Sequence, residues 1–154
     1  MYRQIFLIIA LLSWCNTSFS QLNFGESLKI NDNWKFRKGD TKEASSPGFD
    51  DSKWRTLDLP HDWSVEGPYS PTFASATGYL PGGVAWYRLT LEIPSDKQGK
   101  QVYLYFEGVY RNSEVFINGK SLGMRPNGYI SFYHDITSLV KPGSKNSIAV
   151  RVDH

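Results

Sequence analysis

The feature that most constrains this chain is the recurrence of short runs in which apolar and polar residues alternate. Residues 84–93 form the longest run, and 34–38 and 102–106 repeat the pattern between turn residues. Alternation of period two is typical of strands with one buried face. No long stretch has a helical period, so the sequence predicts an all-β fold.

Asn118-Gly119 is the strongest hairpin signal in the sequence, because both residues tolerate the positive φ of a tight turn. It predicts that residues 114–117 turn back into 120–124. Further runs are expected at 28–30, at 129–133 and in a last inward-facing row of Ile148, Val150 and Val152. About eight strands joined by hairpins predict a jelly-roll, galactose-binding-like β-sandwich.

Residues 39–50 and 51–81 are predicted to be loop. The second loop carries Trp54 and Trp63, so we expect it to pack against the core. A long loop in a compact domain is often functional. The neighbours of Trp34 and Trp86 alternate as in a core, so we expect these side chains to be buried. Exposed tryptophans would instead form a stacking platform for sugars.

The first twenty residues have the layout of a secretory signal peptide. Arg3 precedes an apolar run from 5 to 12, and small residues at 18–20 provide a cleavage site before Gln21. The run is too short to span a bilayer. We therefore expect residues 1–20 to be a signal peptide, 21–154 to be the domain, and the protein to be periplasmic or extracellular. A lipoprotein anchor at Cys15 is disfavoured, because Trp14 is too large to precede a lipidated cysteine.

The charge and the cysteine content exclude several classes of function. The 17 basic residues, of which Arg3 lies in the expected signal peptide, nearly balance the 15 acidic ones. This excludes the basic surface that binds nucleic acid or anionic membranes. The only cysteine, Cys15, is lost with the signal peptide, and three histidines provide no metal-ligand spacing, so we expect no disulfide, metal or cofactor.

Two pairs of residues resemble catalytic pairs but are better explained by structure. His61 and Asp62 are adjacent, so their side chains diverge in extended chain, and we expect Asp62 to cap a turn. Glu107 and Glu114 fall on or beside strands, at positions typical of a solvent-facing side. Neither pair is predicted to be catalytic.

Four stretches occur in an order and spacing that resemble one family, and two later ones fit the same pattern. They are FDDSKW (49–54), LPHDW (59–63), GGVAWYR (82–88), FEGV (106–109) through VFING (115–119), GYISF (128–132) with DIT (135–137), and IAVRVD (148–153). Together they resemble the N-terminal sugar-binding domain of glycoside hydrolase family 2. The likeness is greatest to exported bacterial β-galactosidases, although β-glucuronidases and β-mannosidases share the domain.

The resemblance implies an accessory role. Family members are retaining enzymes whose two catalytic glutamates lie in a TIM-barrel domain farther along the chain. We therefore expect no catalytic residue in this chain and a TIM-barrel domain as its partner in the intact enzyme. The expected substrate is a β-glycoside or oligosaccharide, and the intact enzyme could form a homo-oligomer. Because His154 directly follows a β run, we expect the sequence to be truncated. A stand-alone carbohydrate-binding module and a purely structural sandwich stay open as alternatives.

Three residues are predicted to contact substrate. In some family members an acidic residue just after the last strand binds the sugar, and Asp153 fits that position. Arg111 and Asn112 lie between strands, where loop side chains can reach a ligand. Other members supply an amide side chain from the loop before the strand at 84–93. Here that loop offers Gly82 and Gly83, which have no side-chain donor.

Overall fold

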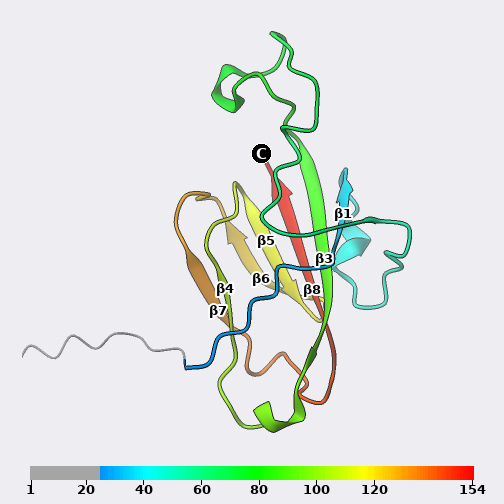
Figure 1. Ribbon diagram of the computed structural model, residues 1–154, viewed down its shortest axis with the longest axis vertical. Coiled ribbons are helices and arrows are strands. Elements are labelled where there is room, and N and C mark those ends of the chain that lie inside the picture. The colour runs from blue at the N-terminus through cyan, green and yellow to red at the C-terminus, as the bar shows by residue number, and fades with distance from the viewer. Residues whose placement is uncertain (1–24) are drawn as a thin grey trace, which may run out of the picture.

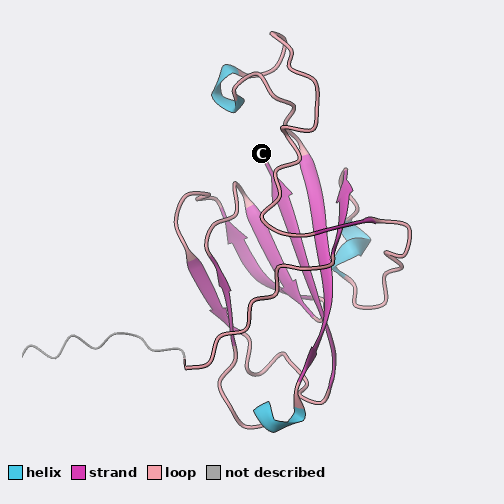
Figure 2. Ribbon diagram, viewed as in Figure 1, coloured by secondary structure: helices cyan, strands magenta, loops and turns pink. Residues whose placement is uncertain are grey.

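The computed structural model describes residues 25–154, which form a two-layered β-sandwich (Figures 1 and 2). Six antiparallel strands make one sheet in the order β2-β1-β3-β8-β5-β6, and β4 and β7 make the second. The strands are β1 (Trp34–Lys38), β2 (Arg55–Leu57), β3 (Val84–Ile93), β4 (Tyr103–Phe106), β5 (Ser113–Ile117), β6 (Lys120–Arg125), β7 (Phe132–Asp135) and β8 (Ser144–Asp153). The only helical elements in this part of the chain are short 3₁₀ turns: η1 (Lys42–Ser45), η2 (Ser75–Thr77) and η3 (Ser95–Lys97). The prediction of an all-β sandwich of eight strands is confirmed.

β3 and β8 form the centre of the large sheet. They pair over ten residues, from Val84 opposite Asp153 to Ile93 opposite Ser144. β8 also pairs with β5, so it joins the two halves of the sheet. The core between the sheets contains the predicted inward row of β8 together with Trp34, Trp63, Leu104 and Phe132.

The outer face of the large sheet is also partly buried. Trp86 and Ala149 on this face pack against Ala44 of η1 and Trp54. Arg88 is only 3% exposed there, although alternation places it opposite the core. The loop that precedes β2 thus covers part of this face, and a two-residue period does not reveal such cover.

Several element boundaries differ from those expected. Residues 28–30 are not a strand, and the three-residue edge strand β2 lies inside the predicted loop 51–81. β7 begins at Phe132 because Asn127 Oδ1 accepts a hydrogen bond from Tyr129 N and holds a turn there. The predicted signal peptide, 1–20, lies outside the described residues. No helix within 25–154 has the length and apolar character needed to cross a membrane.

The predicted hairpin at Asn118-Gly119 is present, with φ of 49° and 84°. The Asn118 side chain also has a second role. Its Nδ2 donates to Leu139 O at 2.8 Å and to Asn146 Oδ1 at 2.9 Å, and its Oδ1 accepts from Ser147 N at 2.9 Å. The turn residue therefore ties β5 to the start of β8.

Candidate functional site

The three predicted binding residues meet where β8 ends. Asp153 N donates to Arg111 O at 3.2 Å, and Asn112 Nδ2 donates to Asp153 O at 3.0 Å. The segment before β5 is thus bonded to the last residues of β8, at the end marked C in Figure 1. The structure brings Asp153, Arg111 and Asn112 together.

Asp153 keeps an accessible carboxylate. Its side chain is 46% exposed, and Oδ2 lies 3.7 Å from Arg151 Nη1. Arg151 bonds more closely to Asp40, at 3.1 Å from Nε and 2.9 Å from Nη2. These bonds from Arg151 hold the pKa of Asp40 below its usual value. Because Asp40 engages the guanidinium, the Asp153 oxygens can accept hydrogen bonds from a ligand, and bonds to a charged acceptor are the stronger ones.

Gly82 and Gly83 have a structural reason to lack side chains. Gly83 N donates to His154 O at 2.5 Å, and His154 N donates back to Gly83 O at 3.1 Å. A Cβ on Gly82 would lie 2.5 Å from His154 O. The glycine pair therefore lets the chain pass closely beside the end of β8, instead of supplying a donor to the site.

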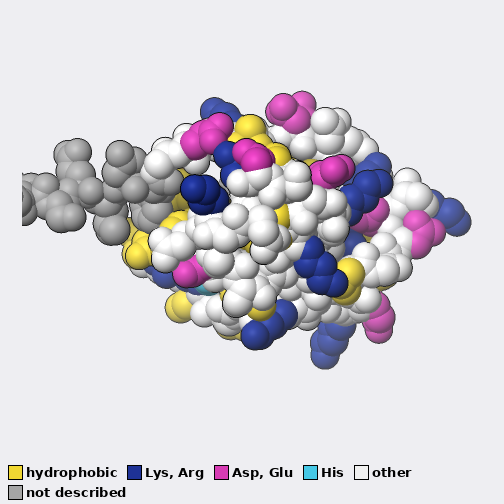
Figure 3. All heavy atoms as spheres, turned by 90° about the horizontal axis from the view of Figure 1, so that it is seen from below, with side chains coloured by type: hydrophobic (Ala, Val, Ile, Leu, Met, Phe, Trp, Pro, Cys, Tyr) yellow, Lys and Arg dark blue, Asp and Glu magenta, His cyan; other side chains and the backbone are white. Residues whose placement is uncertain are grey.

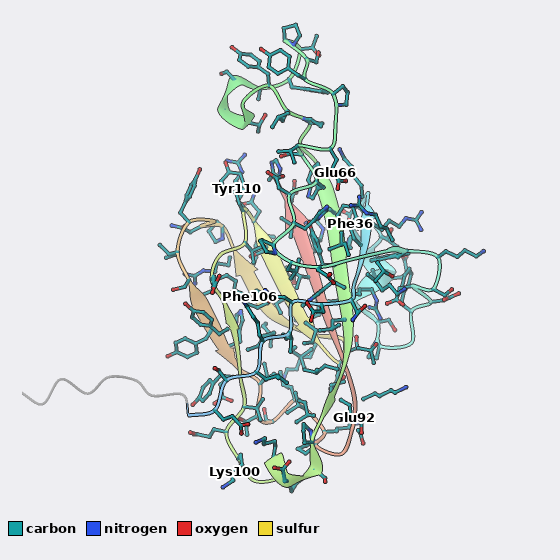
Figure 4. All side chains as sticks on the ribbon, viewed as in Figure 1. Phe36, Glu66, Glu92, Lys100, Phe106 and Tyr110 are labelled. Carbon is teal, nitrogen blue, oxygen red and sulfur yellow. The ribbon has the colours of Figure 1, made fainter. Side chains whose placement is uncertain are left out.

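Residues 64–83 extend beyond this end of the sandwich as an arm whose base is anchored. Glu66 lies at that base (Figure 4) and accepts two hydrogen bonds of 2.7 Å from Arg55. The His61 ring lies between two partners. Its Nε2 is 3.0 Å from Glu66 Oε1, and its Nδ1 is 2.9 Å from the buried hydroxyl of Tyr87. The Arg55 bonds, together with the His61 bond, lower the pKa of Glu66 to about 2.

The turn cap predicted at Asp62 is present, and His61 and Asp62 hydrogen-bond to different partners. Asp62 Oδ1 caps a turn by accepting from Ser64 N at 2.9 Å, while His61 turns to Tyr87 and Glu66. Glu114 lies on β5 and accepts from Ser121 at 2.6 Å, whereas Glu107 follows β4 of the other sheet. No group of three or more metal-ligating side chains occurs within 25–154.

The four tryptophans of the described chain are all buried: Trp34 at 2%, Trp54 at 6%, Trp63 at 4% and Trp86 at 1% exposure. They do not form a stacking platform. The exposed aromatic residues at the site are instead Tyr110 and Tyr129, which no motif of the sequence singles out. Tyr129 directly follows Gly128, and this turn position is the one signal for it in the sequence.

A hollow lies on the outer face of the large sheet. It encloses about 340 Å³ between η1 and β5 and is lined by Asp40, Lys42, Ser45, Trp86, Glu114, Phe116 and Arg151. Its main charged groups are bonded within the protein, Asp40 to Arg151 and Glu114 to Ser121. This hollow is therefore a weaker candidate than the end of β8.

Comparisons with known proteins agree with this arrangement. Residues 34–154 match the family model described as glycosyl hydrolase 2 galactose-binding domain-like. The chain is 50% identical over 145 residues to β-galactosidase BoGH2A of Bacteroides ovatus, covering 93% of this chain and 17% of that protein. A β-glycosidase structure from Bacteroides vulgatus superimposes with a TM-score of 0.80 at 52% identity, covering 84% of this chain and 17% of that one.

A Bacteroides uniformis β-glucuronidase structure is similar as well, with a TM-score of 0.74 at 33% identity, covering 83% of this chain and 14% of that one. The chain thus spans less than a fifth of the length of these relatives. Both the sequence motifs and the strand arrangement lead to one assignment. The chain belongs to the galactose-binding-like N-terminal domain family of glycoside hydrolase family 2.

Proposed function

We propose that this chain is the sugar-contacting accessory domain of an exported retaining β-glycosidase, specifically a β-galactosidase. The observation that carries the proposal is the convergence of Asp153, Arg111 and Asn112 at one exposed end of the sandwich. The 50% identity to a protein named β-galactosidase favours galactosides over glucuronides.

In this proposal the three residues have different roles. The Asp153 carboxylate accepts hydrogen bonds from two sugar hydroxyls, and the exposed Arg111 guanidinium donates to a third oxygen. Asn112 acts as a positioning residue, because its amide nitrogen holds the Asp153 carbonyl. Contacts of this kind orient the sugar before reaction, which can raise turnover as well as affinity.

The chemical step itself belongs to another part of the enzyme. A retaining β-glycosidase needs two carboxyl groups about 5–5.5 Å apart, one to protonate the leaving oxygen and one to attack the sugar. We place this pair in a TIM-barrel domain of the intact protein, against which the end of β8 packs. The proposal also includes export, with residues 1–20 as a cleaved signal peptide, which N-terminal sequencing of the mature protein would test.

The central test is Asp153→Asn in the full-length protein, with hydrolysis of a nitrophenyl β-galactoside as the readout. Loss of two charge-assisted hydrogen bonds predicts a fall in kcat/KM of about 100-fold. Asp96→Asn is the matched control, since Asp96 lies in the exposed turn η3 at the opposite end of the sandwich and should change nothing. Unchanged kinetics in Asp153→Asn would remove this residue from the site.

Two further readouts separate the alternatives. Faster hydrolysis of the matching β-glucuronide would replace the galactosidase assignment with a glucuronidase one. Calorimetric binding of galactosides without any hydrolysis by the full-length protein would favour a non-catalytic carbohydrate-binding module.

A further inference from the structure

We propose that Asn127 is a site of spontaneous deamidation in the folded protein, whereas Asn118 is protected from the same reaction. These are the two asparagines of the chain that a glycine follows, in Asn127-Gly128 and Asn118-Gly119. Glycine has no Cβ to shield its amide nitrogen and bends readily, so an asparagine before it is especially labile. The reaction needs no enzyme, and the fold decides which of the two asparagines undergoes it.

Deamidation starts at the amide nitrogen of the residue that follows the asparagine. This nitrogen loses its proton to base and attacks the side-chain carbon Cγ, which closes a five-membered succinimide ring, and Nδ2 leaves as ammonia. Water then opens the ring. Attack on Cγ gives aspartate, and attack on the main-chain carbonyl carbon gives isoaspartate, in which the main chain runs through Cβ. The net reaction consumes one water, releases one ammonia and leaves a carboxylate in place of the amide.

Asn127 meets the requirements of this reaction. The residue is exposed, and its Oδ1 accepts a hydrogen bond of 2.9 Å from Tyr129 N. The ring of atoms that this bond closes contains Gly128 N, so the bond keeps Cγ near the attacking nitrogen and draws electrons from it. Within residues 25–154, neither Gly128 N nor Asn127 Nδ2 forms a hydrogen bond. The attacking nitrogen can therefore lose its proton, and ammonia can leave, without breaking a contact.

Asn118 is held at both atoms of its side-chain amide. Its Nδ2 donates to Leu139 O at 2.8 Å and to Asn146 Oδ1 at 2.9 Å. Its Oδ1 accepts from Ser147 N at 2.9 Å. The leaving nitrogen is bonded twice, and Cγ cannot turn toward Gly119 N until these hydrogen bonds break. The loss of three such bonds predicts a rate on the order of 30-fold lower than in an exposed turn.

The two turns lie at opposite ends of the sandwich. Asn118 N donates to Ser147 O near the start of β8, whereas Asn112 N, beside the end of β8, donates to Pro126 O. Figure 3 shows the end that carries the Asn118 turn, where basic and acidic side chains are interspersed. A field of one sign, which would speed or slow a base-dependent reaction, is therefore no explanation for protection at Asn118. The hydrogen bonds account for the difference.

The fold also makes the labile pair hard to replace, because position 128 requires glycine. A Cβ there would lie 2.6 Å from Tyr110 Cδ2 and 2.7 Å from Tyr110 Cα. Isoaspartate at position 127 inserts Cβ into the main chain and displaces this closely packed glycine. Tyr110 precedes Arg111, whose carbonyl accepts the hydrogen bond from Asp153 N. Formation of isoaspartate should therefore loosen the contact that holds the end of β8.

The test is to age the full-length protein for several weeks in mildly alkaline buffer and to map its peptides by mass spectrometry. Deamidated peptide should accumulate on the order of 30-fold faster at Asn127 than at Asn118. In urea that unfolds the protein the two rates should converge, because both sites are then unrestrained Asn-Gly sequences. Equal rates in the folded protein would overturn the proposal. So would an intact Asn127 after the time in which the unfolded protein reacts.

Asn127→Ser is the matched control, because serine keeps a side-chain acceptor for the turn but cannot form a succinimide. The aged wild-type protein should unfold at a lower urea concentration than the fresh protein, whereas aged Asn127→Ser should not. An aged wild-type sample rich in isoaspartate with an unchanged midpoint would refute the packing argument at Gly128. Both readouts are independent of hydrolytic activity, so a failure of the proposed function would leave them intact.

Discussion

Arg88 provides the sharpest test of how the outer face of the large sheet is stabilised. Its side chain is 3% exposed, and Nε donates to Asp51 Oδ2 at 2.8 Å. Nη1 donates to the carbonyls of Ala44 and Ser46. The ring centroid of Phe49 lies 5.4 Å from the guanidinium. One buried cation thus satisfies three acceptors in the loop that covers the sheet.

Arg88→Met removes the cation and keeps most of the apolar stem. Breaking a buried ion pair by deleting one partner costs about 3–5 kcal/mol. The Asp51 side chain is 24% exposed and can regain water, so we expect the lower end, about 3 kcal/mol. For a domain of this size that lowers the melting temperature by on the order of 10 °C.

Urea unfolding of the chain measures this change, with Arg37→Met as the control because Arg37 is an exposed residue of the same sheet on β1. Surface substitutions of that kind stay within about 0.5 kcal/mol. The loss of stability in Arg88→Lys should lie between those of Arg37→Met and Arg88→Met, because lysine keeps the charge but lacks the planar guanidinium. A cost below about 1 kcal/mol for Arg88→Met would refute the reasoning.

Three further predictions concern the turn, the arm and the glycine pair. Asn118→Ala should lower the free energy of unfolding by about 2–3 kcal/mol in urea titrations, because it removes three hydrogen bonds and leaves alanine at a φ of 49°. Asn118→Gly should be less destabilising, because glycine tolerates this φ but still lacks the three hydrogen bonds. The folded pKa of Glu66, about 2, is below the usual 4.5, so its stabilising effect is fully present above about pH 4.5 and is lost as pH falls toward 2. Glu66→Gln should therefore flatten the acid limb of a stability-versus-pH curve, and an unchanged limb would contradict the ion pair. Gly82→Ala should lower kcat/KM of the full-length enzyme without unfolding it, as shown by circular dichroism, because its Cβ would displace His154 and with it Asp153.

The central strands of the large sheet could be predicted from the sequence. Every second residue along β3 and β8 faces the core, and the turn at Asn118-Gly119 follows from the positive φ that these two residues tolerate. Asp153 was selected through the family resemblance, and Arg111 and Asn112 through their position between strands. The strands and the turn depend on residues close together in the chain, whereas the meeting of Asp153 with Arg111 and Asn112 depends on the fold.

The parts that escaped prediction depend on contacts between distant segments. Trp86 and Arg88 are buried although they face away from the core, because η1 comes from some forty residues earlier to cover them. The rings of Trp63, His154, Tyr110 and Tyr129 are in contact although they come from four separate segments of the chain. The spacing of apolar residues within a single strand does not reveal contacts between distant segments.

The position of β8 in the sheet has a consequence for biosynthesis. β2, β1 and β3 can pair with one another, and so can β5 and β6, but only β8 connects these two groups. On the ribosome the two half-sheets must therefore wait, with unpaired edges, until residues 144–153 emerge. Unpaired strand edges are prone to aggregation. A nascent chain of this kind depends on rapid completion of β8, or on a chaperone that shields β3 and β5 until it arrives.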